Sequence, residues 1–221
     1  MCGVIGIYSK QVDIPLVKEI FRQTMIRGKH ATGVTYLKGG ELHTIKEGIP
    51  ADKFLEKYDF NEFVNEDGGV YMIGHIRYST SDIRFNQPFS NGTISIAHNG
   101  VLSQEPVEQW KFKTETSNDS EMILRSFEDG FHPLESFAEK SMAVVCISKN
   151  KAVVGFRNHE RPLWVSEMGD SVYFTSTQDI ARRSGLTNTK KCEMFVQYTA
   201  ANSKIEKMAI DYDTNRFQDL Q

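Results

Sequence analysis

Short runs of β-branched and aromatic residues recur along almost the whole chain, whereas apolar residues at helical spacing are rare. Most runs are four to seven residues long, as is typical of strands. The clearest helical pattern spans 15–26, where apolar positions alternate with polar ones behind a proline suited to a first turn. The predicted strands are 3–8, 33–37, 42–46, 70–76, 94–98, 143–147, 152–156, 171–175, 194–199 and 204–210. The predicted helices are 15–26, 51–58, 120–128, 134–140 and 178–184.

The order of these elements indicates an α+β protein with largely antiparallel sheets. Strands mostly follow one another directly, with helices inserted in a few places, so regular βαβ alternation is not supported. The sequence contains no internal repeat and no low-complexity tract. The polar segments 62–69 and 103–117 are interpreted as surface excursions. We therefore expect one domain over 1–221.

Composition places the chain among globular proteins without an obvious polyanionic partner. It has 221 residues, 39% hydrophobic and 25% charged, and a formal net charge of −3. This charge provides no electrostatic basis for binding nucleic acid or an anionic membrane surface. No segment approaches the roughly 20 apolar residues that span a bilayer, and the first residues lack the order of a signal peptide. We expect small-molecule or protein partners and a cytoplasmic location.

The three cysteines, Cys2, Cys146 and Cys192, form an odd number without the spacing of a metal site. Cys146 also lies inside an apolar run. A disulfide framework is therefore not expected. Neither a metal nor a cofactor is expected.

Cys2 has a second interpretation because it follows the initiating methionine. Removal of Met1 would place a thiol and an α-amine on one residue. A free α-amine titrates at about 7.7–8.0, so a fraction is unprotonated at neutral pH and able to act as a base. Nucleophile and base would then come from a single residue. Alone, the β-prone residues Val4, Ile5 and Ile7 favour a structural cysteine that opens a buried strand.

Two glycine-containing motifs have both a structural and a chemical interpretation. Asn99-Gly100 follows a predicted strand, and this dipeptide favours a hairpin turn. An Asn amide beside a Gly backbone N–H also supplies two adjacent donors, as an oxyanion hole requires. Arg27-Gly28 follows the first predicted helix, so Gly28 is interpreted as its C-terminal cap. The polar loop that runs on to Gly33 would alternatively bring backbone groups against a ligand.

Two charged residues are suited to the two ends of a free amino acid. Arg77 ends an apolar run, where its side chain either enters solvent or binds a carboxylate, and Tyr78 beside it would shield that pair from water. Asn118 and Glu121 fit the cap and the reciprocal partner of a helix start. Capping does not require Asp119, whose carboxylate would then be free to receive an ammonium group.

Together these motifs resemble the class II glutamine amidotransferases, from residue 2 to about residue 200. Within that family, the stretches 157–163 and 173–176 are most similar to the glutaminase domain of amidophosphoribosyltransferase. The matching motifs, in family order, are Cys2-Gly3, Arg27-Gly28 with Gly33, Gly74-His75-x-Arg77-Tyr78-x-Thr80, Gln87-Pro88, His98-Asn99-Gly100 and Asp119-Ser120-Glu121.

The resemblance implies an N-terminal-nucleophile fold, a four-layer α/β/β/α sandwich with two stacked antiparallel sheets. It implies that the thiol attacks the side-chain amide of L-glutamine, releasing ammonia first and glutamate afterwards from a thioester. The α-amine would carry the protons. The residues to which it assigns roles are Cys2, Asn99 and Gly100 in catalysis, Arg77 and Asp119 on the substrate carboxylate and ammonium, and Arg27, Tyr78 and Thr80 around the glutamine pocket.

Several features depart from the family pattern. Residues 29–32 replace the usual Pro-Asp-Ser-Ser-like loop, and the glutamate common after Ser176 is missing. The chain ends at Gln221 without a synthase domain, so we expect ammonia to pass to a separate synthase chain; the sequence is also compatible with an oligomer. The alternatives are a silent glutamine-binding regulatory domain, a hydrolase of another γ-glutamyl amide, or a papain-like pair of Cys2 with His75 or His98.

Overall fold

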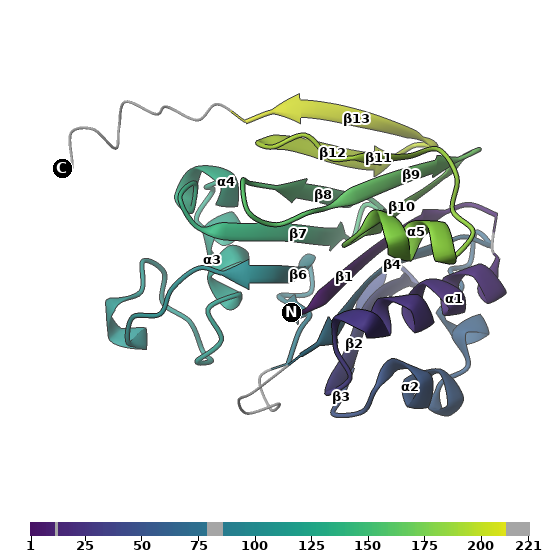
Figure 1. Ribbon diagram of the computed structural model, residues 1–221, viewed down its shortest axis with the longest axis horizontal. Helices are drawn as coiled ribbons and strands as arrows, with labels where there is room; N and C mark the ends of the chain where they lie inside the picture. The colour runs from purple at the N-terminus through teal and green to yellow at the C-terminus, as the bar shows by residue number, and fades with distance from the viewer. Residues whose placement is uncertain (12, 79–85, 211–221) are drawn as a thin grey trace.

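The computed structural model describes residues 1–11, 13–78 and 86–210, in which two antiparallel sheets lie face to face (Figure 1). Within these residues, the seven-stranded sheet has the order β11-β9-β10-β1-β4-β2-β3 and the six-stranded sheet the order β13-β12-β8-β7-β6-β5. The strands are β1 (Gly3–Ser9), β2 (Ala31–Lys38), β3 (Glu41–Glu47), β4 (Val70–Arg77), β5 (Phe89–Ser90), β6 (Ile94–Val101), β7 (Ser141–Ser148), β8 (Val153–Arg157), β9 (Trp164–Met168), β10 (Ser171–Thr175), β11 (Thr189–Lys191), β12 (Val196–Ala201) and β13 (Lys204–Ala209).

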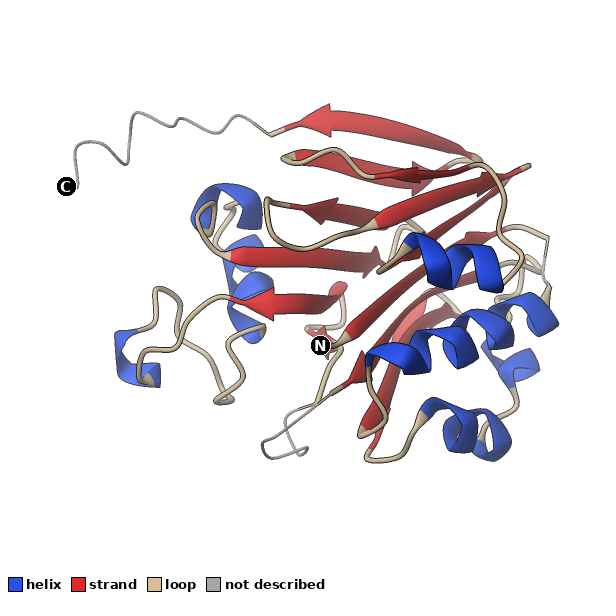
Figure 2. Cartoon of the chain, in the orientation of Figure 1, coloured by secondary structure: helices blue, strands red, loops and turns tan. Residues whose placement is uncertain are grey.

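Helices cover the outer face of each sheet, which gives four layers (Figure 2). On one side α1, α2 and α5 pack on the seven-stranded sheet, and on the other α3 and its neighbour α4 pack on the six-stranded sheet. This arrangement confirms the expected α/β/β/α sandwich of the N-terminal-nucleophile fold. The helices are α1 (Ile14–Thr24), α2 (Ala51–Lys57), α3 (Glu121–Glu128), α4 (Pro133–Ser136) and α5 (Gln178–Arg183), with 3₁₀ turns η1 (Met25–Arg27), η2 (Phe60–Phe63) and η4 (Val107–Gln109).

Burial on both faces explains why the strands read as continuous apolar runs. Successive side chains of a strand point to opposite faces. In β1, Val4 and Tyr8 face the core between the sheets, whereas Ile5 and Ile7 pack beneath the helices. Each such side chain contributes about 1.5–3 kcal/mol when it is fully buried.

The first helix is fixed by a cap and by one apolar stripe. The Asp13 carboxylate accepts a hydrogen bond from the Leu16 backbone N–H at 2.9 Å, which satisfies a donor left free at the helix start. Val17, Ile20 and Phe21 are buried against the sheet. Truncation of Phe21 to alanine would cost about 3–5 kcal/mol of stability. The helix therefore brings the turn that follows it, η1, to the start of β1.

Two local predictions were wrong. The helix expected over 134–140 ends at Ser136, because Phe137 leaves helical geometry and packs its ring edge-on against Phe112. The segment 62–69 is not wholly a surface excursion, since Phe63 is buried and stacks on the ring of Tyr36. Within the part of the chain that the structure describes, no helix is long and apolar enough to cross a membrane.

Candidate active site

Cys2 lies immediately before β1, where η1 and the end of β4 meet it. Its thiol is partly exposed, and Sγ lies 3.8 Å from the backbone oxygen of Tyr78. The Arg27 Nε–H donates a hydrogen bond to the Cys2 backbone oxygen at 3.2 Å. The structure therefore brings Cys2, Arg27 and the Tyr78 backbone, which are distant in sequence, close together.

A second arginine, Arg161, lies at the amino terminus. The Met1 sulfur is 3.8 Å from Nη2 of Arg27 and 3.8 Å from Nη1 of Arg161. Arg161 is held by a hydrogen bond from its Nε–H to the Ser141 hydroxyl at 2.6 Å. Burial, together with the positive charge of Arg161, lowers the pKa of Arg27. The two guanidinium groups give the region around the thiol a positive potential that attracts a substrate carboxylate.

Arg77 is the last residue of β4 and is only 9% exposed, so the solvated strand end considered from the sequence was wrong. The β1–β4 register pairs Gly3 with Ile76, which places Cys2 opposite Arg77. Gly28 permits this approach, since a Cβ on it would lie 2.4 Å from the Arg77 carbonyl. The φ of Gly28 is 174°, so close packing against β4, rather than a left-handed helix cap, requires glycine here.

Tyr78 does not cover this site as expected. Its side chain is 56% exposed, and its ring lies 5.1 Å from the His30 ring, centroid to centroid. His30 comes from the loop that departs from the family pattern, so this contact replaces the predicted shielding. Thr80, the remaining predicted pocket residue, lies outside the described residues.

Asn99 and Gly100 lie inside β6, not in a turn. They pair with Ala143 and Met142 of β7, so the hairpin interpretation was wrong. Asn99 is 3% exposed, and among the described residues its side-chain Nδ2 has no hydrogen-bond partner. A buried donor without an acceptor is unfavourable, and an oxyanion would satisfy it. Gly100 has a φ of +150°, and a Cβ there would lie 1.9 Å from the Ser141 oxygen.

A buried hydrogen-bond network holds His98, the residue before this pair. The Gln87 side chain accepts from the His98 N–H at 2.6 Å and donates to the His98 oxygen at 3.2 Å. His98 Nε2 is 3.2 Å from the Ser141 oxygen, which can only accept, so Nε2 carries the proton. Nδ1 then accepts from the Ser120 hydroxyl at 2.8 Å.

The histidines do not resemble a general base. Both ring nitrogens of His98 are engaged, and burial lowers its pKa. Burial, with the nearby charge of Arg77 adding to it, also lowers the pKa of His75 to about 3. The geometry therefore favours structural roles for both residues over a papain-like pair.

Asp119 is less free than the sequence suggested. Its Oδ2 accepts hydrogen bonds from the backbone N–H groups of Leu102 at 2.6 Å and Ser103 at 3.0 Å. These residues directly follow the end of β6. One carboxylate thus fixes the segment behind the Asn99-Gly100 pair, and a substrate ammonium would have to share it.

The expected capping box is also wrong in part. Asn118 Oδ1 does accept from the Ser120 N–H at 3.0 Å. However, the Glu121 carboxylate does not reach back to the Asn118 N–H; it accepts from the N–H groups of Glu115 and Thr116 at 2.9 and 2.8 Å. Glu121 therefore holds the loop before the helix instead of capping the helix itself.

The site combines a thiol, a buried amide donor, guanidinium groups and one carboxylate. These groups are suited to nucleophilic attack on a carbonyl of a zwitterionic substrate. Within the described ranges, no group of three or more His, Cys, Asp or Glu residues could hold a metal ion. The sequence did not assign Arg161 or Ser141 to the site, and only the stretch 157–163, which resembles the family, pointed to that region.

Comparison with known proteins shows which of them have a sequence similar to that of this chain. No model of a known protein family matches it. It is 34% identical over 141 residues to an amidophosphoribosyltransferase of Methanocaldococcus jannaschii. The aligned region covers 57% of this chain and 29% of that protein. The chain thus spans less than a third of this relative's length.

Solved structures give the same fold. A glutamine phosphoribosylpyrophosphate amidotransferase from B. subtilis has a TM-score of 0.78 at 20% identity, covering 96% of this chain and 50% of that one. A glutamine aminotransferase class-II domain protein from Silicibacter pomeroyi has a TM-score of 0.58 at 10% identity, covering 93% of this chain and 98% of that one. The chain is thus similar in sequence to amidophosphoribosyltransferases and has the fold of the glutamine amidotransferase class-II domain.

Proposed function

We propose that this chain hydrolyses the side-chain amide of L-glutamine with Cys2 as the nucleophile, once Met1 is removed. The observation that carries the proposal is the buried Nδ2 of Asn99, which has no partner among the described residues and lies in β6 beside Gly100. An oxyanion that forms on the amide carbonyl would accept from this donor.

The proposed reaction has two stages. The Cys2 thiolate adds to the δ-carbonyl carbon, and the carbonyl oxygen becomes an oxyanion held by Asn99 and Gly100. The α-ammonium of Cys2 gives a proton to the leaving nitrogen, the C–N bond breaks, and ammonia and a thioester form. Water then adds to the thioester, the α-amine takes its proton, and the C–S bond breaks to give glutamate and the free thiol.

Substrate binding is proposed to use opposite charges at the two ends of glutamine. Arg77 would bind the α-carboxylate with a guanidinium fork, and Asp119 would bind the α-ammonium. Arg27, with Tyr78 and Thr80, would line the pocket. Arg27 is supported by its contact with Cys2 and by its positive charge.

The ammonia acceptor is proposed to be a synthase on a separate chain. The support is the name of the Methanocaldococcus relative, an amidophosphoribosyltransferase, which denotes transfer to an acceptor. Pull-down of the mature protein, followed by a glutaminase assay with and without the recovered proteins, tests this part. Stimulated glutamate release supports it, and release that no recovered protein changes argues against it.

One experiment tests the chemistry. Mass spectrometry of the purified protein establishes whether Cys2 is amino-terminal, and glutamate release from glutamine is then measured. Cys2→Ala, or a variant that retains Met1, should reduce the rate at least 10³-fold, while Cys146→Ala, which removes a buried cysteine elsewhere, should not. Full activity of the Cys2 variants would refute the proposal. Turnover of another γ-glutamyl amide without turnover of glutamine would instead assign the related hydrolase.

A further inference from the structure

Arg161 lies beside the amino terminus, and the reaction described above gives it no role. It belongs to the stretch 157–163, in the connection from β8 to β9. Its Nε–H donates a hydrogen bond to the Ser141 hydroxyl at 2.6 Å, and its Nη1 lies 3.8 Å from the Met1 sulfur. One guanidinium group therefore connects the start of β7 with the residue that precedes Cys2.

Ser141 is a fixed anchor for this guanidinium because it packs against β6. Its backbone oxygen accepts a hydrogen bond from His98 Nε2 at 3.2 Å. A Cβ on Gly100 would lie 1.9 Å from the same oxygen. These two contacts come from the residues on either side of Asn99. The Arg161 side chain is thus held at a defined position relative to the proposed oxyanion donors.

Another side chain of the same stretch holds the start of β7 without Arg161. Asn158 is fully buried, and its Oδ1 accepts a hydrogen bond from the Met142 N–H at 2.9 Å. The Asn158 N–H in turn donates to the Met142 oxygen at 3.0 Å. Arg161 itself is only partly buried. We therefore expect the fold to tolerate the loss of the Arg161 side chain.

No carboxylate within the described ranges forms an ion pair with either arginine at the amino terminus. The charges that act on Arg27 are those of Arg161 and Cys2. The charges of Asp119 and Arg161 both act on the buried His98. Asp119, however, accepts two backbone N–H groups and makes no ion pair with Arg161. The two guanidinium groups therefore leave a net positive charge beside the thiol.

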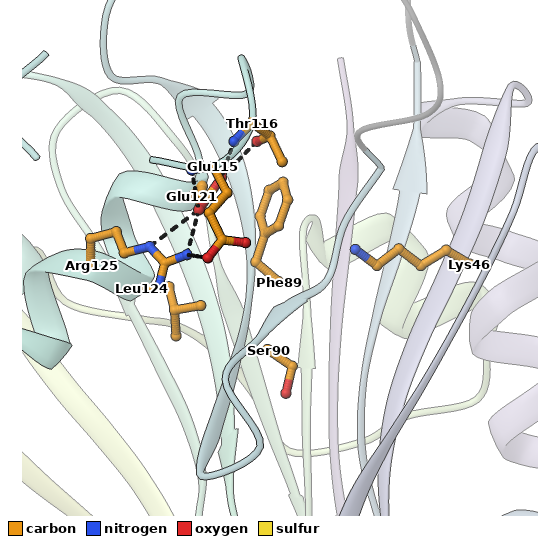
Figure 3. A pocket seen from close by; sticks show the side chains of 8 residues that line it. All are labelled: Lys46, Phe89, Ser90, Glu115, Thr116, Glu121, Leu124 and Arg125. Atoms are coloured by element: carbon orange, nitrogen blue, oxygen red, sulfur yellow. Dashed lines mark hydrogen bonds and ion pairs between the residues drawn. The ribbon is translucent and has the colours of Figure 1, made fainter. Parts of the chain in front are cut away.

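Arg125 shows the opposite arrangement, in which carboxylates neutralise an arginine (Figure 3). It lies 2.7 Å from Glu121 and 2.9 Å from Glu128. The hydrogen bond with Glu128, and then the one with Glu121, raises the pKa of Arg125. Burial and the charge of Arg161 lower the pKa of Arg27 instead. The surroundings of the amino terminus thus favour a negative charge.

The charged groups around Cys2 are Arg27 on η1, Arg77 at the end of β4, and Arg161. Tyr78 contacts the thiol through its backbone oxygen only. A cation close to a cysteine favours the thiolate, which is the nucleophilic form. We propose that Arg161 is a positioning residue that places a fixed positive charge beside Cys2 and so favours its thiolate. This inference rests on the proposed function, in which Cys2 is the nucleophile after removal of Met1.

The rate of thiol alkylation tests the proposal without any turnover. The full chain is treated with methionine aminopeptidase, and reaction of Cys2 with iodoacetamide is followed by mass spectrometry from pH 6 to pH 10. Cys146 and Cys192 are internal controls: both are buried, and burial raises the pKa of Cys192 to about 12. Neither should react at pH 7.

Variants at position 161 separate the charge from the shape of the side chain. Arg161→Met should alkylate about threefold more slowly than the unaltered protein at pH 7, and the two rates should converge at pH 10. Arg161→Lys, which keeps the charge, should restore most of the rate. Arg182→Met removes an arginine that is 78% exposed on α5 and should change nothing. In glutamate release at pH 7, Arg161→Met should lower kcat by a larger factor than it raises KM.

An unchanged alkylation profile in Arg161→Met, or an equal loss in Arg161→Lys, would overturn the inference. If Arg161→Met does not fold, Arg161→Gln decides the question, because it keeps a donor for Ser141 without the charge. The two proposals fail separately. Slower alkylation in a protein that releases no glutamate refutes the glutaminase alone, and glutamate release with unchanged alkylation refutes the role of Arg161 alone.

Discussion

Asp119 has two separable tasks, and substitution to asparagine or alanine distinguishes them. The carboxylate accepts two backbone N–H groups, from Leu102 and Ser103, and is also proposed to bind the substrate ammonium. Asparagine keeps an oxygen that can accept the backbone donors but removes the charge. Alanine removes both. The structural task should therefore survive in Asp119→Asn, and the binding task should not.

The magnitudes follow from the two contacts at 2.6 and 3.0 Å. A hydrogen bond to a charged acceptor contributes about 1.5–3 kcal/mol, and a neutral one about 0.5–1.5 kcal/mol. Because Asp119 is only half-buried, we take the lower ends, so that Asp119→Ala should lose about 3 kcal/mol of unfolding free energy and Asp119→Asn about 1–2 kcal/mol. Loss of the ammonium contact by about 2 kcal/mol would raise KM roughly 30-fold. Since the ammonium is remote from the scissile amide, kcat should change little.

The assay combines urea unfolding at pH 7.5 with glutaminase kinetics on mature protein. Asp129→Asn, an exposed aspartate just after α3, is the matched control and should alter neither measurement. An Asp119→Asn variant that unfolds as easily as Asp119→Ala would refute the acceptor argument. An unchanged KM in Asp119→Asn would refute the ammonium contact.

Three further predictions concern the surroundings of the site. The folded-state pKa of His75 is lowered to about 3 from an ordinary 6.5, so the unfolded chain binds more protons below pH 6.5. Urea unfolding should therefore show stability falling as pH decreases from 6.5 toward 3. His75 should contribute up to about 1.4 kcal/mol per pH unit, buried His98, whose pKa is also lowered, adds to this, and His75→Gln should reduce the dependence. Gly100→Ala should greatly lower the melting temperature and abolish glutamate release, because its Cβ meets the β7 backbone, whereas Gly92→Ala, at a φ of +84° with no atom within 4 Å, should cost only about 1 kcal/mol. Ser120→Ala removes the hydroxyl that bonds His98. We expect it to lower the free energy of unfolding by about 1–3 kcal/mol. It should also lower kcat by a larger factor than it raises KM, which a purely structural loss would not do.

The apolar runs predicted most of the fold because burial on two faces makes them conspicuous. The strands that the sequence did not predict lack this signal. β9 contains Ser166, which is fully buried but bonded to the hydroxyl of Thr189 on β11 at 2.6 Å. β11 itself is a short, basic edge strand. Their pairing depends on partners that periodicity does not reveal.

The errors at the site have the same physical origin. Asn99-Gly100 favours a turn locally, but pairing with β7, more than 40 residues away, keeps the pair in a strand. Arg161 is about 160 residues from the Met1 sulfur that it contacts. The prediction that the Asp119 carboxylate is free was wrong, because the tertiary structure makes it the acceptor of the Leu102 and Ser103 backbone N–H groups. Residue identities were predicted from motif order, whereas their partners required the fold.

The candidate site depends on both sheets together, and this explains why it lies at one end of β1. β1 and β4 belong to one sheet and bring Cys2 and Arg77 together, while β6 belongs to the other and carries the Asn99 donor. The distance between nucleophile and donor is therefore set by how the sheets pack. That packing rests on side chains such as Val4 and Val145, which share the core between the sheets and are fully buried. Because Val4 is only two residues from Cys2, the same contact that stabilises the sandwich also positions the thiol.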